Sequence, residues 1–267
     1  MVSKFENTIQ SNIVKYRNAI KYFTVVVTVI LLMIAVLMLY APFSNLQKFN
    51  IVYADSSLIS FDKEELLNDE KFYELKKHEA YLKSKLLVAK NDSISLSVNL
   101  PDSTISIEVQ GVLLHQSKLT SISNSMFFER ANHLALFNYF QSPFKTKKSI
   151  SNIEKEPVIY MKAPKDTIEA AKNLFKADTS LAKRVYVRVE LERGLTIILT
   201  DNQNKWCSSY LYTIFSSGLL SFKLSLKDIF HFQVPRYNPV IRVKLNRNDL
   251  ISIYRAIPDK AYVTIHM

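Results

Sequence analysis

The chain has little cysteine, glycine or proline: one, three and eight among 267 residues. The single cysteine, Cys207, excludes a disulfide within the chain. It lies in an alternating apolar stretch with no glycine elbow and no adjacent base, which favours a small buried side chain over a nucleophile. So few glycines and prolines argue against a linker-rich or low-complexity protein. The length allows one sizeable core or two small ones.

The sequence also lacks the patterns that indicate a metal site or a nucleic-acid-binding site. No two histidines have the i,i+4 or other spacing typical of metal ligands. The five are His78, His115, His133, His231 and His266. The sequence therefore predicts no metal and no cofactor. The net charge is +11, but no basic stripe interleaved with aromatics indicates nucleic acid. Such a surface would more simply meet anionic lipid headgroups or an acidic wall polymer, or be inert.

The dominant feature that is present is an uncharged apolar run, residues 23–41, "FTVVVTVILLMIAVLMLYA". As a helix it would extend roughly 28 Å, close to the hydrocarbon thickness of a bilayer. Tyr22 and Tyr40 would lie at the two interfaces. We expect Pro42 to end the helix. The run predicts a single transmembrane helix that contacts the lipid bilayer through residues 23–41.

The charges on either side of this run predict its orientation. Residues 1–22 carry four basic side chains and one acid, whereas residues 42–61 carry only Lys48 and Asp55. The positive-inside rule then places residues 1–22 in the cytoplasm and residues 42–267 outside. A cleaved signal peptide fits less well, because the run is long and no small-x-small cleavage site follows it. We expect an inner (cytoplasmic) membrane, single-pass protein with a periplasmic or extracytoplasmic C-terminal domain.

A charged helix is predicted at residues 62–86, within a juxtamembrane segment 42–92. Asp62 with Glu65 has the spacing of a capping box. One face carries four apolar residues and is interrupted by Glu79; the four are Phe72, Leu75, Leu82 and Leu86. A stalk or dimerising helix is one interpretation. A helix packed on its own domain is favoured, because the apolar row is too short for a coiled coil.

Residues 93–267 have the pattern of a mainly β (α+β) exterior domain. Alternation predicts a hairpin at 93–109 with a third strand to 119, and a second hairpin at 184–202. We expect a helix at 127–140 and a polar basic loop at 145–156. Further elements are predicted as a strand at 157–164, a helix at 165–177 and a strand at 206–215. The last stretch, 240–265, has the pattern of strand, helix and strand.

Two segments of this domain resemble the L,D-transpeptidase catalytic domain family, whose members cross-link peptidoglycan stem peptides. "SISLSVNLPDSTISIEVQGVLLHQSKL" is similar to the opening strand, acidic turn, second strand and glycine of that family. "IRVKLNRNDLISIYRAIPDKAYVTI" resembles its closing segment. The positions in matching order are Ile241, Arg242, Asp249, Ile253, Tyr254, Pro258 and Val263. The resemblance implies a transpeptidase-like β-sandwich.

The family's nucleophile motif, Ser-x-Gly-Cys immediately before Ile-Arg, is missing. Tyr237, Asn238, Pro239 and Val240 occupy those positions, and a valine cannot form a thiolate. The family's upstream His-Gly is also absent. Arg242 is retained, and the resemblance implies a remnant pocket in which it accepts a carboxylate beside His231 and Tyr237. The alternative is that Arg242 is a surface arginine beside a half-buried histidine and has no binding role.

The sequence therefore predicts a non-catalytic, membrane-anchored protein of a bacterial cell envelope, a pseudoenzyme that binds peptidoglycan or a partner protein. The alternative is a structural single-span subunit of an envelope complex, divisome-like or secretion-like, whose unrelated β module pairs edge strands with a partner. A true relative of the transpeptidases should show two sheets that enclose a cleft beside Arg242.

Overall fold

The computed structural model describes residues 2–54, 70–155, 184–202, 228–229, 231, 233–235 and 237–267. The chain forms two compact units. One contains Met1–Gln47 with Ser217–Tyr237, and the other contains Lys48–Ser216 with Asn238–Met267. The predicted elements at 157–164, 165–177 and 206–215 lie outside the described residues, as do Cys207, Asp62 and Glu65.

The first unit contains most of helix α1 (Val2–Tyr53). From Lys21 to Tyr53 this helix is long and apolar enough to cross a membrane, by length and composition only, a test that a signal sequence also passes. The prediction that Pro42 ends the helix is wrong, because α1 continues for eleven more residues. A proline removes one helical hydrogen bond. Nearby, Asn45 Nδ2 donates to the Ala41 carbonyl at 2.7 Å.

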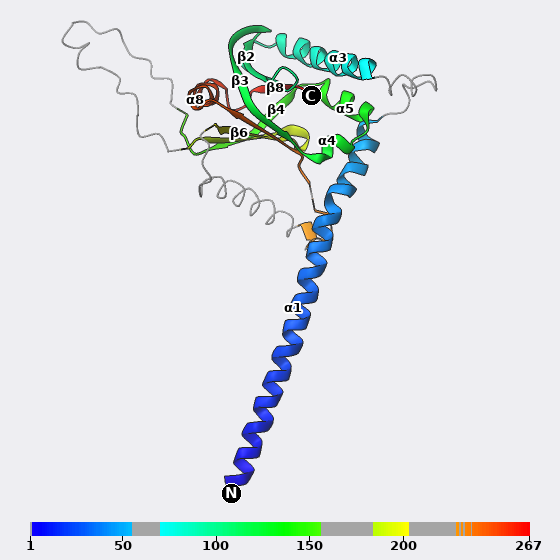
Figure 1. Cartoon of the computed structure of the whole chain (residues 1–267), viewed down its shortest axis with the longest axis vertical. Helices are drawn as coiled ribbons and strands as arrows, with labels where there is room; N and C mark the ends of the chain where they lie inside the picture. Colours follow the sequence, from blue (N-terminus) through cyan, green and yellow to red (C-terminus); the bar gives the residue numbers. More distant parts are fainter. Residues whose placement is uncertain are drawn as a thin grey trace, which may run out of the picture. The chain divides into compact units, whose positions relative to one another are not determined.

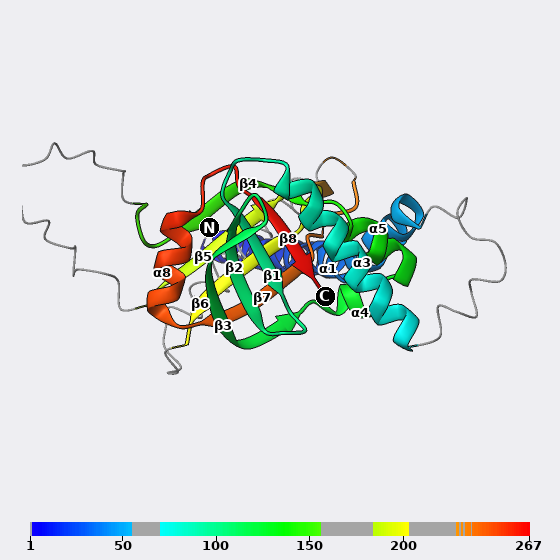
Figure 2. The same cartoon turned by 90° about the horizontal axis from the view of Figure 1, so that it is seen from above.

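The second unit is built around a closed barrel of eight described strands (Figures 1 and 2). The strands are β1 (Ser95–Asn99), β2 (Thr104–Val109), β3 (Val112–Asn124), β4 (Phe144–Ser151), β5 (Tyr186–Leu191), β6 (Thr196–Asp201), β7 (Val240–Leu245) and β8 (Tyr262–His266). Their order around the barrel is β1-β2-β3-β7-β6-β5-β4-β8. The pairs β1/β8 and β6/β7 are parallel, and the other neighbours are antiparallel. Both predicted hairpins are confirmed.

Alternation along the strands places apolar side chains inside the barrel. Leu96 and Val98 of β1, for example, are almost completely buried, and Ile241 and Val243 of β7 are completely buried. Eight strands enclose a space just wide enough for side chains to fill. The domain is therefore a packed barrel with a hydrophobic core. The finer expectation, a transpeptidase-like β-sandwich, is not confirmed by this topology.

The residues 145–156, predicted as a loop, instead include most of β4. Phe144 and Thr146 are buried, whereas Lys147 and Lys148 are exposed. β4 pairs with β5 over most of its length and with β8 at its start. The lysines on the outer face obscured the period-2 pattern in the sequence.

Helices surround the barrel. They are α3 (Glu70–Ala89), α4 (Met126–Arg130), α5 (His133–Phe140) and α8 (Arg247–Ala256), with a short 3-10 helix η2 (Glu192–Gly194) between β5 and β6. The predicted helix at 127–140 is thus two helices, capped by Ser125 and Asn132. α3 packs against β8 and α5, which confirms a helix packed on its own domain. Figure 2 shows α3 beside β1 and β8, with α8 near the other end of the barrel.

Candidate binding site

The position at which the transpeptidase resemblance expects a nucleophile lies at the start of β7. The Ser125 backbone N–H donates to the Val240 carbonyl at 3.0 Å, and the Thr196 N–H donates to the Pro239 carbonyl at 3.0 Å. The residues before Ile241-Arg242 are therefore held between the end of β3 and the start of β6. The backbone is ordered by pairing there, but the side chain at position 240 offers no nucleophile.

The three residues of the predicted remnant pocket are distributed over both units. Arg242 lies on β7 between the buried Ile241 and Val243, so that its side chain is exposed on the outside of the barrel. His231 and Tyr237 belong to the first compact unit, whereas Arg242 belongs to the second. A pocket shared by the three stays a prediction.

A pocket of about 220 Å³ does lie in the second unit, between α3, α4, α5 and the end of β8. It is lined mainly by apolar and aromatic side chains and has a few polar groups. The lining residues are Tyr73, Lys77, Ala80, Asn124, Phe128, Glu129, Leu136, Phe137, Phe140, Ile265 and Met267. None of the three predicted site residues is among them. In the sequence, Asn124 and Phe128 are close neighbours of Ser125, whose backbone N–H donates a hydrogen bond to the Val240 carbonyl.

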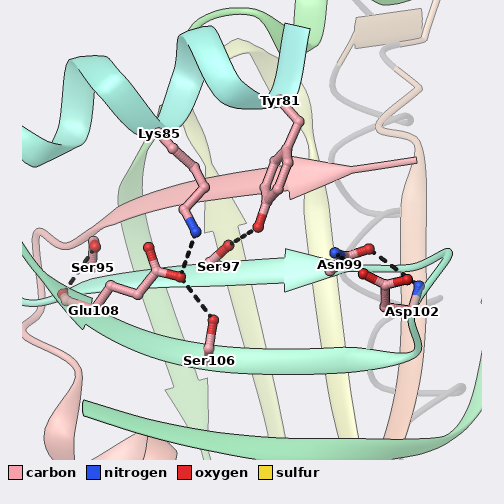
Figure 3. Close-up of polar contacts among 8 residues, drawn as sticks. All are labelled: Tyr81, Lys85, Ser95, Ser97, Asn99, Asp102, Ser106 and Glu108. Atoms are coloured by element: carbon pink, nitrogen blue, oxygen red, sulfur yellow. Dashed lines mark hydrogen bonds and ion pairs between the residues drawn. The ribbon is translucent and has the colours of Figure 1, made fainter. Parts of the chain in front are cut away.

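The α3 wall of this pocket is fixed to the barrel by polar contacts (Figure 3). The Tyr81 hydroxyl lies 2.6 Å from Ser97 Oγ. Lys85 Nζ donates to Glu108 Oε1 at 2.9 Å, and Ser106 Oγ donates to the same oxygen at 3.1 Å. Burial alone would lower the pKa of Lys85, but its hydrogen bond to the buried Glu108 outweighs that effect together with nearby charges, and the pKa is raised. Small serine side chains on the outer face of β1 and β2 leave room for this helix.

His266, at the end of β8, completes the contact between α3 and the barrel. Its ring stacks on Tyr81 at 4.8 Å between centroids, and its Nδ1 lies 3.1 Å from Asn99 Oδ1. That oxygen also accepts from the Asp102 N–H, so Nδ1 is the protonated nitrogen of His266. Burial and the neighbouring His78 lower the pKa of His266. The folded domain therefore disfavours protonation of this ring.

Aromatic side chains behind the pocket form a second support. Phe140, which lines the pocket, contacts the rings of Tyr139 and Phe144 at 5.1 and 5.7 Å. Arg193 closes this cluster, because its guanidinium lies 3.9 Å from the Phe144 ring centroid and donates to the carbonyls of Tyr139 and Ser142. Burial lowers the pKa of Arg193 and raises that of Tyr139. These contacts hold α5 and the start of β4 together.

The end of α1 joins the same cluster. Phe49 lies edge-on to Phe127 and Tyr139, with ring centroids 5.1 and 5.0 Å apart. Asn138 Nδ2 donates to the Tyr53 carbonyl at 2.8 Å. The last turn of α1 is therefore part of the domain that carries the pocket.

Sequence reasoning missed the pocket. Its lining comes from three helices and the ends of two strands that are distant in the sequence, and no motif links them. The signal that could have indicated it is the aromatic density of "HLALFNYF", residues 133–140, which exceeds what one side of a short surface helix needs.

Among the described residues, no group of three or more His, Cys, Asp or Glu side chains is placed to hold a metal ion.

Comparison of the chain with models of known protein families, with curated proteins and with solved structures finds no match.

Proposed function

We propose that this chain is a non-catalytic, membrane-anchored protein of a bacterial-type cell envelope, and that its barrel domain binds a partner protein. The observation that carries the proposal is the pocket beside α3, α4 and α5, whose surface is mainly apolar and aromatic. Concave apolar sites with a few convergent polar groups are the usual binding sites of proteins. The pocket would accept one apolar side chain of the partner.

The chemistry of the pocket favours a protein over peptidoglycan. Glycan strands and stem peptides carry many hydroxyl, amide and carboxylate groups, which lose hydration when buried without partners. Here the polar groups are limited to a few side chains at the pocket, chiefly Lys77, Asn124 and Glu129. An apolar anchor with polar surroundings is the arrangement found at the centre of protein interfaces.

The absence of catalysis is supported by the start of β7. The elements of the closing segment follow in the expected order: β7 with Ile241-Arg242, α8, Pro258 and β8. The opening hairpin has Asp102 in its turn and Gly111 before the third strand. We infer that the domain lacks transpeptidase activity, because Val240 occupies the position at which the resemblance expects a cysteine and cannot form an acyl-enzyme.

The anchor supports a location at the membrane surface. We infer that residues 23–41 span the inner membrane with residues 1–22 in the cytoplasm, from the charge asymmetry. Seven residues separate Ala41 from Phe49, which is buried in the second unit. Even a fully extended chain of this length reaches only about 30 Å. The partner would therefore meet the barrel close to the bilayer.

Edge-strand pairing, the mode suggested for an unrelated envelope module, gains no support. Each of the eight described strands has a neighbour on both sides, since the ladder closes through β1 and β8. A closed barrel removes the free edge that a partner strand would need. Contacts through side chains are the better-supported mode.

The test is a photo-crosslinking experiment with the full chain in its native membrane. A photoreactive phenylalanine replaces Tyr73 at the pocket, and cross-linked proteins are identified by mass spectrometry. We expect a discrete envelope protein whose cross-link is lost when Asn124→Trp fills the pocket. Ser123→Trp, at a neighbouring exposed position on β3, is the matched control and should preserve the cross-link. Peptidoglycan cross-linking by the purified chain would contradict the proposal.

A further inference from the structure

Helix α3 presents its apolar row to solvent. The residues that it buries against the barrel are Ala80, Tyr81, Ser84 and Val88. On the opposite face Leu75, Leu82 and Leu86 are 69, 46 and 67 % exposed. Isolated surface leucines are ordinary, but an ordered row on one helix indicates an interaction surface.

The row has heptad spacing. Phe72, Leu75, Glu79, Leu82, Leu86 and Ala89 alternate at intervals of three and four residues, as in the contact seam of paired helices. The centre of the buried face, marked by Ser84, is on the other side of the helix. The seam therefore points away from the barrel, and a second helix could pack along it.

Basic side chains border this seam on both sides at intervals of seven. Lys76, Lys83 and Lys90 follow one border. Lys71, His78 and Lys85 follow the other, where Lys85 is already paired with Glu108 of the barrel. In the middle, Glu79 accepts from Lys76 at 2.6 Å and is paired with Lys83 at 2.7 Å. These two lysines lower the pKa of Glu79 to about 2. The surface thus combines an apolar row, one fixed carboxylate and an excess of positive charge at its edges.

The apolar surface continues beyond the end of the helix. A Cβ placed on Gly111 would lie 3.3 Å from the Ala89 Cβ, so the β2–β3 turn adjoins the last turn of α3. The next three residues, Val112, Leu113 and Leu114, are each more than half exposed. A partner that follows the seam would meet further apolar contacts there.

Neither a second copy of this chain nor a lipid surface complements the outer face of α3. Pairing two α3 seams would oppose basic borders in either orientation, and a parallel pair would also oppose the two Glu79 side chains. A bilayer would have to accommodate the Glu79 carboxylate within the apolar row, which is unfavourable. Acidic borders on another helix would instead complement the lysines.

We propose that the outer face of α3 is a docking surface for an amphipathic helix of a partner protein whose apolar row is bordered by Asp and Glu. The surface shares no residue with the pocket, so it is a second site beyond the proposed function. Leucines of the partner helix would pack between Leu75, Leu82 and Leu86. Its acidic side chains would lie beside Lys76, Lys83 and Lys90.

The probe is a fluorescent designed peptide of three heptads with Leu at the seam positions and Glu at the bordering positions. Its counterpart carries Lys at the bordering positions. Neither pairs with itself, because like charges would oppose. Binding to the full chain in nanodiscs of zwitterionic lipid is measured by fluorescence anisotropy. We expect the acidic peptide to bind at least tenfold more tightly than the basic one, and Leu82→Ser with Leu86→Ser to abolish binding.

Matched variants separate the possible outcomes. Leu87→Ser removes an exposed leucine outside the seam and should leave the affinity unchanged, whereas Lys83→Gln with Lys90→Gln should weaken the acidic peptide about tenfold. Asn124→Trp should also leave the affinity unchanged, so failure of the pocket and failure of this surface are distinguishable. The proposal is overturned if neither peptide binds or both bind equally. It is also overturned if the chain associates with itself and Leu82→Ser with Leu86→Ser abolishes that association. Protection of residues 70–89 from hydrogen exchange by anionic lipid alone would overturn it as well.

Discussion

Lys85 on α3 and Glu108 on β2 form an ion pair across the outer face of the barrel, with 2.9 Å between Nζ and Oε1. Glu108 is almost fully buried, whereas Lys85 keeps part of its side chain in water. The ion pair extends from solvent into the contact between α3 and the barrel, which is otherwise formed by serine, tyrosine and histidine side chains. It fixes the helix that carries both the pocket wall and the outward leucine row.

Removal of this lysine should destabilise the domain. Lys85→Met would leave the Glu108 carboxylate buried with only neutral donors, and we expect a loss of about 2–3 kcal/mol in the free energy of unfolding. Adding Glu108→Gln should restore part of that loss, because no uncompensated charge remains. Denaturant unfolding measures both. Lys83→Met, at an exposed pair, should change stability by less than about 0.5 kcal/mol, and an equal effect of the two lysines would argue against the buried pair.

His266 should make the domain less stable in mild acid. Its pKa is lowered in the folded state by burial, then by His78, while the unfolded side chain titrates near 6.5. The unfolded state therefore binds more protons, and stability falls as the pH drops below about 6.5 towards the folded pKa. We expect the melting temperature of the full chain in detergent to be about 2–4 °C lower at pH 5.5 than at pH 7.5.

The surroundings of His266 identify the matched variants for this experiment. After burial, His78 opposes protonation of the ring most, Asp102 and Glu74 favour it more weakly, and Lys77 opposes it most weakly. His266→Phe keeps a ring to stack on Tyr81 but cannot titrate, so the dependence on pH should flatten. His115→Gln, at an exposed position, should leave it unchanged. An unaltered slope in His266→Phe would assign the effect to other groups.

Arg193 should be irreplaceable by lysine. Its guanidinium donates to three carbonyls, those of Tyr139, Ser142 and Pro143, while lying over the Phe144 ring. A lysine ammonium cannot make this planar set of contacts. We expect Arg193→Lys to lower the free energy of unfolding by about 1–2 kcal/mol, measured by denaturant unfolding. The neighbouring exposed Glu192→Gln is the control and should be close to neutral.

The strands of the barrel could be predicted from the sequence because their alternation is local. Leu96 and Val98 point inward and Ser95 and Ser97 outward, and this pattern is readable in "SISLSVNL". β4 could not be predicted in the same way, because Lys147 and Lys148 dominate its composition. Its strand conformation depends on pairing with β5 and β8, which are distant in sequence.

The pocket could not be predicted from the sequence, and the outer face of α3 could be predicted only in part. The apolar face of α3 was evident from Leu75, Leu82 and Leu86, but its direction was not, because an apolar face ordinarily turns towards the core. Here the outer face of the barrel offers Ser97, Ser106 and Thr264, which suit Tyr81 and Lys85 better than leucine. The helix therefore packs through its small and polar side. Which face of the helix packs on the barrel depends on the surfaces of both the helix and the barrel. It therefore cannot be predicted from the sequence of the helix alone.

Peptidoglycan sacculi should retain the purified chain only through general charge attraction. The net charge is +11, and wall polymer is acidic, so pelleting is expected at low ionic strength. At about 1 M salt the screening length falls to about 3 Å, and pelleting should be lost. Arg242→Ala should behave like Lys147→Ala, since both residues are exposed on the outside of the barrel and each change removes one charge. Retention at high salt that requires Arg242 would instead indicate a stem-peptide site beside β7 and would displace the partner-protein proposal.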